Sequence, residues 1–577
     1  MTVNLCINTG THDSSVTIMK DGKLLIHMLE ERLSHRKHDA FPVMAIDKVK
    51  EYVDFVDNCS FTDLQHQLVD FKWPTQLLFK SLHPNLWKIW TSKSLNSPLF
   101  SDGSFEYNVF ESHHDLHAIV SLCHSGFDDA VLVVIDGAGS TYSYGKENQT
   151  IYESCGKNLE IKERVIVGDG SEVVDIYNQE IPNFVKDVTN IGAGYVYASV
   201  TGCLSFNTID CGKTMGLSAY GEDDENIPQL ISFENCGNNN FTLGMTEGQP
   251  ECGQTHAIIN EHPVKDFYVN DYIEIPPLDL CTEEQLRLQQ NLAYRVQDDY
   301  EKYLIYTCKK ALEMSNSRNL VLSGGCALNC VANYKLLKSL PEDVNLYVEP
   351  VSDDSGVGLG GAYCLTDTDN FKLESLYLGG QLEYDYELLG NNEIEYDVEP
   401  ENVAEIISNG NIVAIAQGRS EIGPRALGNR SILFDPRVKN GKDIVNEVKN
   451  REYFRPFAGT VLKEYARDWF DMDRLDESPF MMYAVDVLPD KIDLIPSIVH
   501  VDGTCRIQTV TSEQNKNYYN LIAEFYKLTG VPILFNTSFN LAGDTMVETI
   551  DDAFYTLRSS QINYMYLPEI GKLIQIN

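Results

Sequence analysis

The stretch that decides the fold is Val3-Asn4-Leu5-Cys6-Ile7-Asn8, which runs into the polar turn Thr9-Gly10-Thr11-His12-Asp13. Its rough alternation predicts a β-strand over residues 3–8, and residues 14–18 begin a second strand. An Asp21-Gly22 pair between apolar runs then predicts a tight hairpin into a third strand at residues 24–29. The first turn is free to receive a phosphate or a substrate.

Further along the chain, two apolar runs of the buried-strand type lie at residues 130–135 and 319–322. Asp136-Gly137 follows the first run, and Ser323-Gly324-Gly325 follows the second. A long helical pattern at residues 283–315 separates the two. Strands alternating with helices predict an α/β fold.

The character of the sequence changes after about residue 367. A loop rich in Gly, Asn and Glu is expected at residues 379–400, and a new α/β segment begins with a strand at 411–416. A chain of 577 residues also predicts more than one domain. We therefore predict two domains, 1–372 and 373–577, with the boundary near residues 368–380.

Composition narrows the class of protein. The net charge of −40 disfavours broad binding to nucleic acid, because such a surface repels polyanions. No apolar run reaches the ~18–20 residues that span a bilayer, and the N-terminus does not read as a secretory signal. The 14 cysteines form no Cys-x-x-Cys pair, which is typical of reduced cysteines. We expect a cytoplasmic protein without a membrane partner.

One insert departs from this acidic background. Residues 71–101 contain no acidic residue but hold four lysines and three of the four tryptophans, namely Lys72, Lys80, Lys88, Lys93, Trp73, Trp87 and Trp90. Basic groups interleaved with aromatic rings suit stacked bases and phosphates. The alternative is a loop or helical insert whose tryptophans pack inward, and the sequence leaves both readings open.

A histidine pair is the first candidate for chemistry. His113 and His117 stand four residues apart, so on a helix they share one face, as two ligands of one metal must. The turns after two strands, at Asp136 and at Asp353-Asp354, offer carboxylates. Histidine nitrogens with carboxylate oxygens suit Fe(II), Mn or Zn. The alternative is a surface pair on a helix, with unrelated aspartates in turns.

The second candidate is the Ser323-Gly324-Gly325 turn, which stands between a strand and a helix and is followed by Asn329. Glycines there let backbone N–H groups approach a phosphate, and the helix N-terminus favours its charge. The third is the run from Gly418 to Ser431, rich in Arg and Gly, with Lys449, Arg451, Arg455, Arg506 and Ser538 downstream. Arginine forks match phosphate oxygens, although solvated surface arginine is the alternative.

Together these motifs resemble the NodU/CmcH-type O-carbamoyltransferases. The resemblance runs in order along nearly the whole chain. The matching motifs are His12-Asp13-Ser14-Ser15, Glu30-Glu31-Arg32-Leu33, Arg36-Lys37-His38-Asp39, the segment from His113 to Ala118, Gly212-Lys213-Thr214-Met215-Gly216, the Ser323 turn, the run from Gly423 to Ser431, the segment from Lys449 to Phe457, Asp502-Gly503-Thr504-Cys505-Arg506 and Phe535-Asn536-Thr537-Ser538-Phe539-Asn540.

The resemblance implies an N-terminal actin-like ATPase domain, which begins strand–turn–strand, and a C-terminal YrdC-like domain. It implies a metal, expected to be Fe(II) or a similar divalent ion, held by His113, His117, Asp136 and Asp354. It implies catalytic roles for His12, Asp13 and Lys37, with His12 as our hypothesis for the general base. The residues expected at the adenylate are Gly212, Lys213, Gly216, Gly324, Gly325 and Asn329. Those expected to bind carbamoyl phosphate and Mg-ATP are Arg425, Lys449, Arg455, Arg506 and Ser538.

The implied reaction is ATP-dependent transfer of a carbamoyl group from carbamoyl phosphate, through a carbamoyl-adenylate, to a hydroxyl. A small sugar, nucleoside or antibiotic is the expected acceptor. The alternative acceptor is a hydroxymethylpyrimidine in a nucleotide or DNA, with Trp87 and Lys88 contacting it. Threonylcarbamoylation of tRNA, an actin-like kinase and an inactive binding module are weaker rivals. A homodimer remains open.

Overall fold

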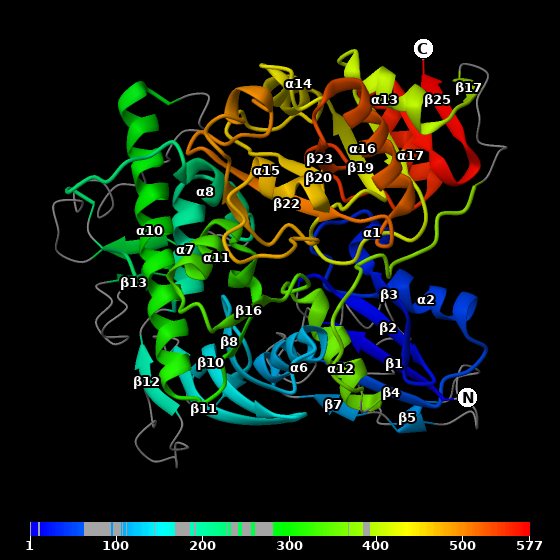
Figure 1. Ribbon diagram of the computed structural model, residues 1–577. Coiled ribbons are helices and arrows are strands. Elements are labelled where there is room, and N and C mark those ends of the chain that lie inside the picture. The colour runs from blue at the N-terminus through cyan, green and yellow to red at the C-terminus, as the bar shows by residue number, and fades with distance from the viewer. Residues whose placement is uncertain are drawn as a thin grey trace. The chain divides into compact units, whose positions relative to one another are not determined.

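The computed structural model describes residues 2–9, 12–62, 94–95, 105–106, 108–110, 112–142, 145–167, 185–189, 192–227, 229–231, 241–244, 256–259, 281–366, 368–384 and 393–576. The chain forms two compact units. The first unit combines Met1–Cys123 with Pro350–Asn577, and the second is His124–Glu349. Figure 1 gives the element labels used below.

The N-terminal part of the first unit is built on a five-stranded sheet. Its order is β3-β2-β1-β4-β7, with bounds Lys23–Leu29, Ser15–Lys20, Val3–Asn8, Asn58–Thr62 and Asn108–Phe110. β2 runs antiparallel to both β3 and β1, whereas β1, β4 and β7 run parallel to one another. Asp21 and Gly22 both have positive φ, the geometry of the two-residue hairpin expected there.

The second unit repeats this topology. Its sheet has the order β12-β11-β10-β8-β15-β16, with bounds Val185–Thr189, Asn158–Val167, Gly145–Cys155, Asp129–Ile135, Asn319–Ser323 and Asn345–Val348, and β9 (Thr141–Tyr142) pairs with β10. The first strand of this unit, β8, again lies inside the sheet. On one side it pairs antiparallel with β10, which pairs antiparallel with β11, and on the other side it pairs parallel with β15, which pairs parallel with β16. Two sheets with one strand order confirm the actin-like fold, although the sequence itself showed no repeat.

Four helices of the second unit pack together beside its sheet. They are α7 (Ala193–Cys203), α8 (Cys211–Ser218), α10 (Glu283–Glu313) and α11 (Cys330–Ser339), and α10 packs against the other three. The helix expected at residues 283–315 is α10, which starts with a capping box between Thr282 and Gln285. The described residues also form two small sheets of two strands each. They are β13–β14 (Phe241–Gly244, His256–Ile259) in the second unit and β5–β6 (Ser94–Leu95, Phe105–Glu106) in the first.

Two helices of the first unit meet unusually closely. α12 (Ser355–Thr366) packs against β1, β2 and β4, and it also approaches α6 (His113–Ser125). A Cβ on Gly360 of α12 would stand 2.4 Å from the carbonyl oxygen of Leu116 on α6. Glycine at this position therefore allows the approach, and the residue that precedes α12, Asp354, comes to lie beside the first turn of α6.

The C-terminal part of the first unit holds a nine-stranded sheet of order β17-β25-β24-β18-β19-β23-β20-β22-β21. The bounds are Glu393–Asp397, Lys572–Ile576, Tyr564–Leu567, Val413–Ala416, Arg430–Phe434, Ile533–Ser538, Ala458–Leu462, Thr504–Val510 and Ala484–Asp486. Its helices include α13 (Pro400–Ser408), α14 (Gly441–Val448), α16 (Lys516–Thr529) and α17 (Ile550–Arg558).

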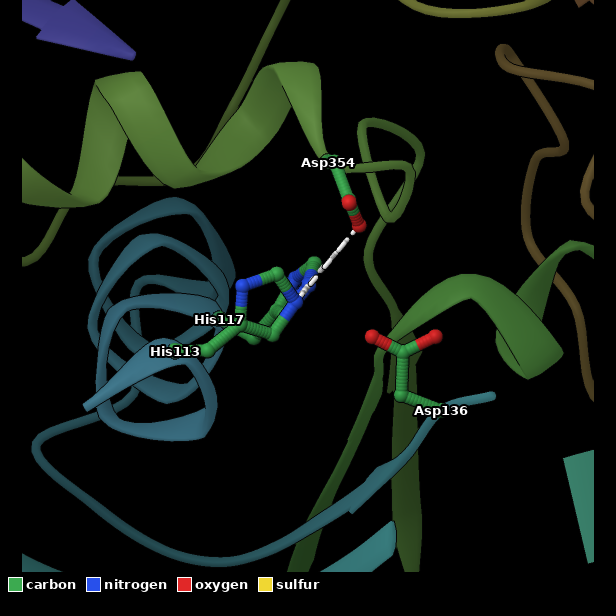
Figure 2. Close-up of side chains that lie close together, drawn as sticks. All are labelled: His113, His117, Asp136 and Asp354. Carbon is green, nitrogen blue, oxygen red and sulfur yellow. Dashed lines mark hydrogen bonds and ion pairs between the residues drawn. The ribbon is translucent and has the colours of Figure 1, made fainter. Parts of the chain in front are cut away.

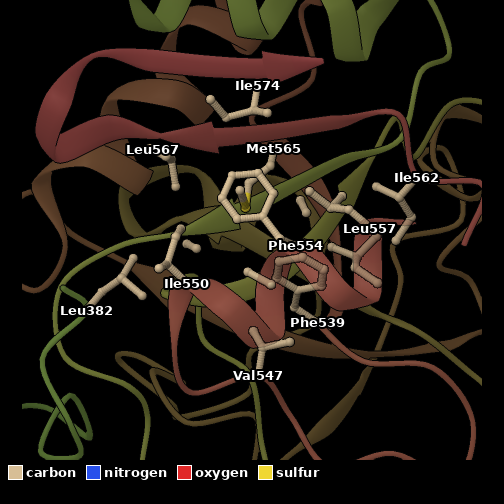
Figure 3. Close-up of a cluster of buried hydrophobic side chains, with 14 residues drawn as sticks. Leu382, Phe539, Val547, Ile550, Phe554, Leu557, Ile562, Met565, Leu567 and Ile574 are labelled. Atoms are coloured by element: carbon tan, nitrogen blue, oxygen red, sulfur yellow. The ribbon is translucent and has the colours of Figure 1, made fainter. Parts of the chain in front are cut away.

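A buried apolar cluster holds α17 on this sheet. Phe554 and Leu557 of α17 pack with Met565 and Leu567 of β24 and Ile574 of β25 (Figure 3). The expectation of a loop throughout residues 379–400 is wrong in part, because β17 pairs antiparallel with β25. Pairing with β25 at the sheet edge overrides the polar composition there. Among the residues that the structure describes, none lies in a helix long and apolar enough to span a bilayer.

Candidate functional site

Two histidines and one aspartate of the first unit converge on a small buried volume (Figure 2). His113 Nε2 and His117 Nε2 lie 3.1 Å apart on adjacent turns of α6. Asp354 Oδ1 lies 3.5 Å from His113 Nε2 and 3.9 Å from His117 Nε2. The ligand spacing expected from the sequence is therefore realised, with both imidazoles aimed at the same carboxylate.

These distances fit a metal ion. With metal–ligand bonds of about 2.0–2.2 Å, neighbouring tetrahedral ligands stand roughly 3.3–3.6 Å apart. The three side chains are 2%, 0% and 6% exposed, so water does not compete freely for them. Burial alone would raise the pKa of Asp354, but His12 and His113 hold it well below its ordinary value. An ionised carboxylate facing two imidazole nitrogens is a donor set suited to Fe(II), Mn or Zn.

The neighbouring Asp353 has a different role. Its carboxylate accepts hydrogen bonds from the backbone N–H of Ser355, at 3.2 Å, and from the Ser355 hydroxyl. Burial, followed by the negative charge of Asp13, raises the pKa of Asp353 to about 7. Asp354, and not Asp353, thus lies beside the histidines. This is the aspartate that the family resemblance implied.

A hydrogen-bonded chain of side chains lies beside the three ligands. Asp13 accepts from His12 Nδ1 at 2.7 Å and from His38 Nδ1 at 2.8 Å. Burial would raise the pKa of Asp13, but the hydrogen bonds from both histidines lower it. The bond to Asp13 raises the pKa of His38, against the effect of burial. The other ring nitrogen of His12, Nε2, lies 3.6 Å from Asp354 Oδ2.

The fourth expected ligand, Asp136, belongs to the second unit and is drawn with the others in Figure 2. It follows β8 and is held by its own turn. Its carboxylate accepts from Gly137 N at 2.7 Å, and its carbonyl accepts from Asn148 Nδ2 at 2.8 Å. A Cβ on Gly194 would stand 2.5 Å from that carbonyl oxygen. Asn148 and Gly194 were not singled out by the sequence.

The glycine turn after β15 lies against this same segment of the second unit. Gly324 has a φ of +85°, and a Cβ there would stand 2.4 Å from the carbonyl oxygen of Ile135. A Cβ on Gly325 would stand 3.0 Å from Asp136 Oδ1. Asn329 caps α11 by accepting from Ala332 N and also exchanges hydrogen bonds with Gln297. Tight packing accounts for Gly324, and Asn329 has a structural task.

The other expected adenylate residues lie on α8. Gly212 and Gly216 are inside this helix, and a Cβ on Gly212 would meet nothing within 4 Å. Lys213 forms an ion pair with Asp210, with Nζ and Oδ2 3.1 Å apart. Trp87 and Lys88, the expected acceptor residues, lie outside the described residues.

A cluster of cations occupies the C-terminal part of the first unit. Lys449 follows α14 and is 2% exposed. Its Nζ donates to Ser538 O at 2.5 Å, to Asn540 Oδ1 at 3.0 Å and to Ser538 Oγ at 3.3 Å. Burial, and then the charges of Arg451, Arg455 and Lys37, lower the pKa of Lys449 well below its ordinary value.

The arginines of this cluster repel one another in the same way. Burial, with the nearby charges of Arg455 and Arg506, lowers the pKa of Arg451, whose guanidinium lies 5.0 Å from the Phe457 ring centroid. Arg506 Nε is buried and has no hydrogen-bond partner among the described residues. Like charges gathered in a half-buried place are costly unless an anion joins them. We name this group, Lys37, Lys449, Arg451, Arg455 and Arg506, the cationic cluster.

The arginine-rich run between β18 and β19 divides into two roles. Arg419 donates to the carbonyl oxygens of Leu25, Leu378 and Gly379, and so joins the two sheets of the first unit. Arg430 is fully buried and donates to backbone carbonyls, Gln417 O among them. These two arginines are structural, which corrects the reading of the whole run as an anion site. Arg425, half-buried in the loop after Gly423, is the remaining candidate.

Glu421 shapes that loop and escaped the sequence analysis. Its buried carboxylate accepts from Leu427 N at 2.7 Å, Asn429 N at 2.8 Å and Arg430 N at 3.3 Å. Three backbone donors on one carboxylate fix the path of the Arg425 loop. Asn540 belongs to a motif that matches the family but was given no role, although it lies only two residues from Ser538 and accepts hydrogen bonds from Ser538 and Lys449.

The chain is similar to known proteins along most of its length. The family profile described as "Carbamoyltransferase N-terminus" matches residues 75–363, and that described as "Carbamoyltransferase C-terminus" matches residues 404–572. The nodulation protein NolNO of Sinorhizobium fredii is 30% identical over 96% of this chain and 78% of its own length. The nodulation protein NolO of Bradyrhizobium diazoefficiens is 30% identical over 78% of this chain and 77% of its own.

Among solved structures, full-length HypF in its phosphate- and nucleotide-bound form is similar over 63% of this chain and 46% of its own, with 12% identity and a TM-score of 0.37. Both family profiles, together with a relative of this identity and coverage, show the family. The chain belongs to the carbamoyltransferases of the NodU/NolO type and is a carbamoyltransferase enzyme.

Proposed function

We propose that the protein transfers a carbamoyl group from carbamoyl phosphate to a hydroxyl of a small molecule, with ATP consumed to make a carbamoyl-adenylate. The observation that carries the proposal is the cationic cluster. Burial, and then the charges of Arg451, Arg455 and Lys37, lower the pKa of Lys449 there, and burial with the charges of Arg455 and Arg506 lowers the pKa of Arg451. Such a group suits two polyanionic co-substrates. The metal-ligand cluster in the same unit then suits a separate transfer step.

The activation step uses the cationic cluster. Carbamoyl phosphate is cleaved by water to carbamate and phosphate, and a carbamate oxygen then attacks the α-phosphorus of Mg-ATP and releases pyrophosphate. Charge spreads over phosphoryl oxygens in both events, and fixed cations such as Lys449, Arg455 and Arg506 stabilise it. Ser538 and Arg425 are proposed to orient the phosphates. Because carbamate is lost readily, a water-excluding site is needed.

The transfer step uses the histidines of the first turn and of α6. When bound, a divalent metal supplies Lewis acidity toward the carbamoyl oxygen. His113, His117 and Asp354 would hold it, with Asp136 proposed as the fourth ligand. Asp13 accepts from His12 Nδ1, which leaves Nε2 to take the proton of the acceptor hydroxyl. The alkoxide oxygen then bonds to the carbamoyl carbon, and AMP leaves.

The adenylate residues expected from the family resemblance, Gly212, Lys213, Gly216, Gly324, Gly325 and Asn329, remain part of this proposal. So does Lys37, which adds its charge beside Lys449 and adjoins His38 in sequence. A hydroxymethylpyrimidine in a nucleotide or DNA is the second acceptor class, favoured by the basic and aromatic composition of residues 71–101.

Mass spectrometry of the products tests the function. The protein would be incubated with carbamoyl phosphate, Mg-ATP, Fe(II) and a panel of sugars, nucleosides, nucleotides and hydroxymethylated DNA. An ATP-dependent gain of one carbamoyl group identifies both reaction and acceptor class. If AMP and pyrophosphate form but no acceptor is modified, the proposed activation step stands and the panel lacks the true acceptor. Absence of AMP and pyrophosphate as well would contradict the proposed route.

A further inference from the structure

The chain crosses from one unit to the other twice. We call these two crossings the passages, and the residues of the second unit next to them form a buried pair. The passages lie between Cys123 and His124 and between Glu349 and Pro350. His124 and Glu349 are therefore the terminal residues of the second unit, and they contact each other. His124 Nδ1 lies 3.1 Å from each carboxylate oxygen of Glu349, and both side chains are 0% exposed.

Each partner belongs to a segment that carries proposed metal ligands. His124 lies in the last turn of α6, whose first turns hold His113 and His117. Glu349 directly follows β16 and precedes Asp354 by five residues. A rigid helix on one side and five residues on the other are short connections, so a shift of the pair is passed on to the ligands.

The pair is also fixed to the sheet that leads to Asp136. Glu349 N donates to Leu322 O of β15 at 3.0 Å, and β15 runs parallel to β8, which ends one residue before Asp136. Tyr347 donates its hydroxyl to Glu349 Oε2 at 3.3 Å. The pair is thus hydrogen-bonded to the sheet of its own unit, while its two residues lead along the chain to the histidines of α6 and to Asp354.

The chemistry of the contact suits positioning more than stability. Removing an imidazole and a carboxylate from water offsets much of their attraction, so an apolar pair would stabilise the fold as well. A ring N–H that contacts both carboxylate oxygens fixes the orientation of the two side chains, because rotation of either group breaks the contact.

We propose that His124 and Glu349 are positioning residues that hold the two passages of the chain together and thereby set the geometry of the metal ligands. The proposal rests on the metal site of the proposed function. It adds residues that do not touch the metal, and that act along the chain through α6 and through residues 350–354.

Anaerobic titration of the full chain with Co²⁺ alone tests this, with visible absorption reporting both affinity and ligand geometry. Glu349→Gln is expected to weaken binding about tenfold, the lower end of what supporting contacts of metal ligands contribute, and to change the absorption bands. Tyr347→Phe, which spares the fold, is expected to weaken binding by about twofold to threefold, because it removes a single hydrogen bond to the same carboxylate.

Glu163→Gln is the matched control. Glu163 is a buried carboxylate of the second unit that pairs with Lys310 at 2.6 Å, and neither residue lies on a segment with a ligand. Reduced Co²⁺ affinity in Glu349→Gln with unchanged affinity in Glu163→Gln, at comparable losses of melting temperature, supports positioning. Unchanged affinity in Glu349→Gln or Tyr347→Phe overturns it, as does an equal loss in Glu163→Gln. Failure of the unsubstituted protein to bind Co²⁺ rejects the metal site itself, and the inference with it.

Discussion

The two charged clusters of the first unit are opposites in their electrostatics. In the metal-ligand cluster the groups attract one another, because the histidines hold the pKa of Asp354 down and keep its carboxylate ionised. In the cationic cluster they repel one another, and the pKa of Lys449 is depressed beside Arg451 and Arg455. A cation proposed to bind at the first cluster would meet groups that already attract one another, whereas anions proposed to bind at the second would relieve the repulsion among its cations.

Replacing Lys449 with Met is expected to separate the clusters most sharply. The buried cation contacts the end of β23, where the co-substrate phosphates are proposed to bind, and its loss should lower AMP and pyrophosphate formation by about 10³-fold. Co²⁺ binding should stay unchanged. Lys439→Met, which removes an exposed lysine ten residues away, is the control for the change of net charge. Normal pyrophosphate release from Lys449→Met would exclude the cationic cluster from activation.

Replacing His117 with Ala is expected to give the converse result. One imidazole of the ligand set is lost, so bound metal measured by elemental analysis should fall below stoichiometric amounts, and carbamoyl transfer should drop by about 10²–10³-fold. Formation of AMP and pyrophosphate should persist. If that activity fell in parallel with transfer, the two clusters would not serve separate steps.

Replacing His12 with Ala tests the proton acceptor with the metal retained. We expect transfer to slow by about 10²-fold, the usual contribution of a general base, while metal content and pyrophosphate release stay normal. Single-turnover measurement of transfer from preformed adenylate is the appropriate readout. A rate within twofold of the unsubstituted protein would assign the proton to another group.

Proton uptake on ligand binding tests the difference between the two clusters in the unsubstituted protein. Because burial and the neighbouring cations lower the pKa of Lys449, a bound anion should raise it, so binding of carbamoyl phosphate or ATP should take up a proton at pH values between the pKa of Lys449 before and after binding. Calorimetry in two buffers of different ionisation enthalpy should give an uptake of up to about one proton per site. Lys449→Met should abolish the difference between the buffers.

The smallest expected effect concerns the His38–Asp13 contact. The raised pKa of His38 contributes stability that is complete below its unfolded pKa, about 6.5, and is lost as the pH rises through its folded pKa. His38→Gln should therefore lower the melting temperature by about 1–2 °C at pH 6 and by less at pH 9. An equal loss at both pH values would show that the contact contributes without its charge.

Local periodicity explains what the sequence predicted well. The four-residue spacing of His113 and His117 is meaningful only on a helix, and α6 supplies it. Asp21-Gly22 likewise determined a hairpin because only that backbone geometry joins the two strands tightly. In both cases neighbours in sequence decide the outcome. The convergence of Asp354 on α6 instead depends on the close approach at Gly360, which no local pattern encodes.

The arginines mark the limit of sequence reading. Arg419, Arg425 and Arg430 look alike in the sequence, yet Arg419 and Arg430 donate to backbone carbonyls, which gives these two arginines a structural role. Which carbonyls are left without partners is decided by sheet pairing far away in the chain. The repeat of strand order in the two units was invisible for a similar reason, since topology is kept by packing while side chains change.

The discontinuity of the first unit also has a consequence for synthesis on the ribosome. Strands β1 to β7 emerge early, but α12, which packs on them, begins only at Ser355. At 5–20 residues per second, about 10–50 s pass between the two events. The continuous second unit is complete in this interval and is able to fold first. Until then the nascent N-terminal sheet exposes the apolar face that α12 later covers, which makes it a natural substrate for chaperones that act during translation.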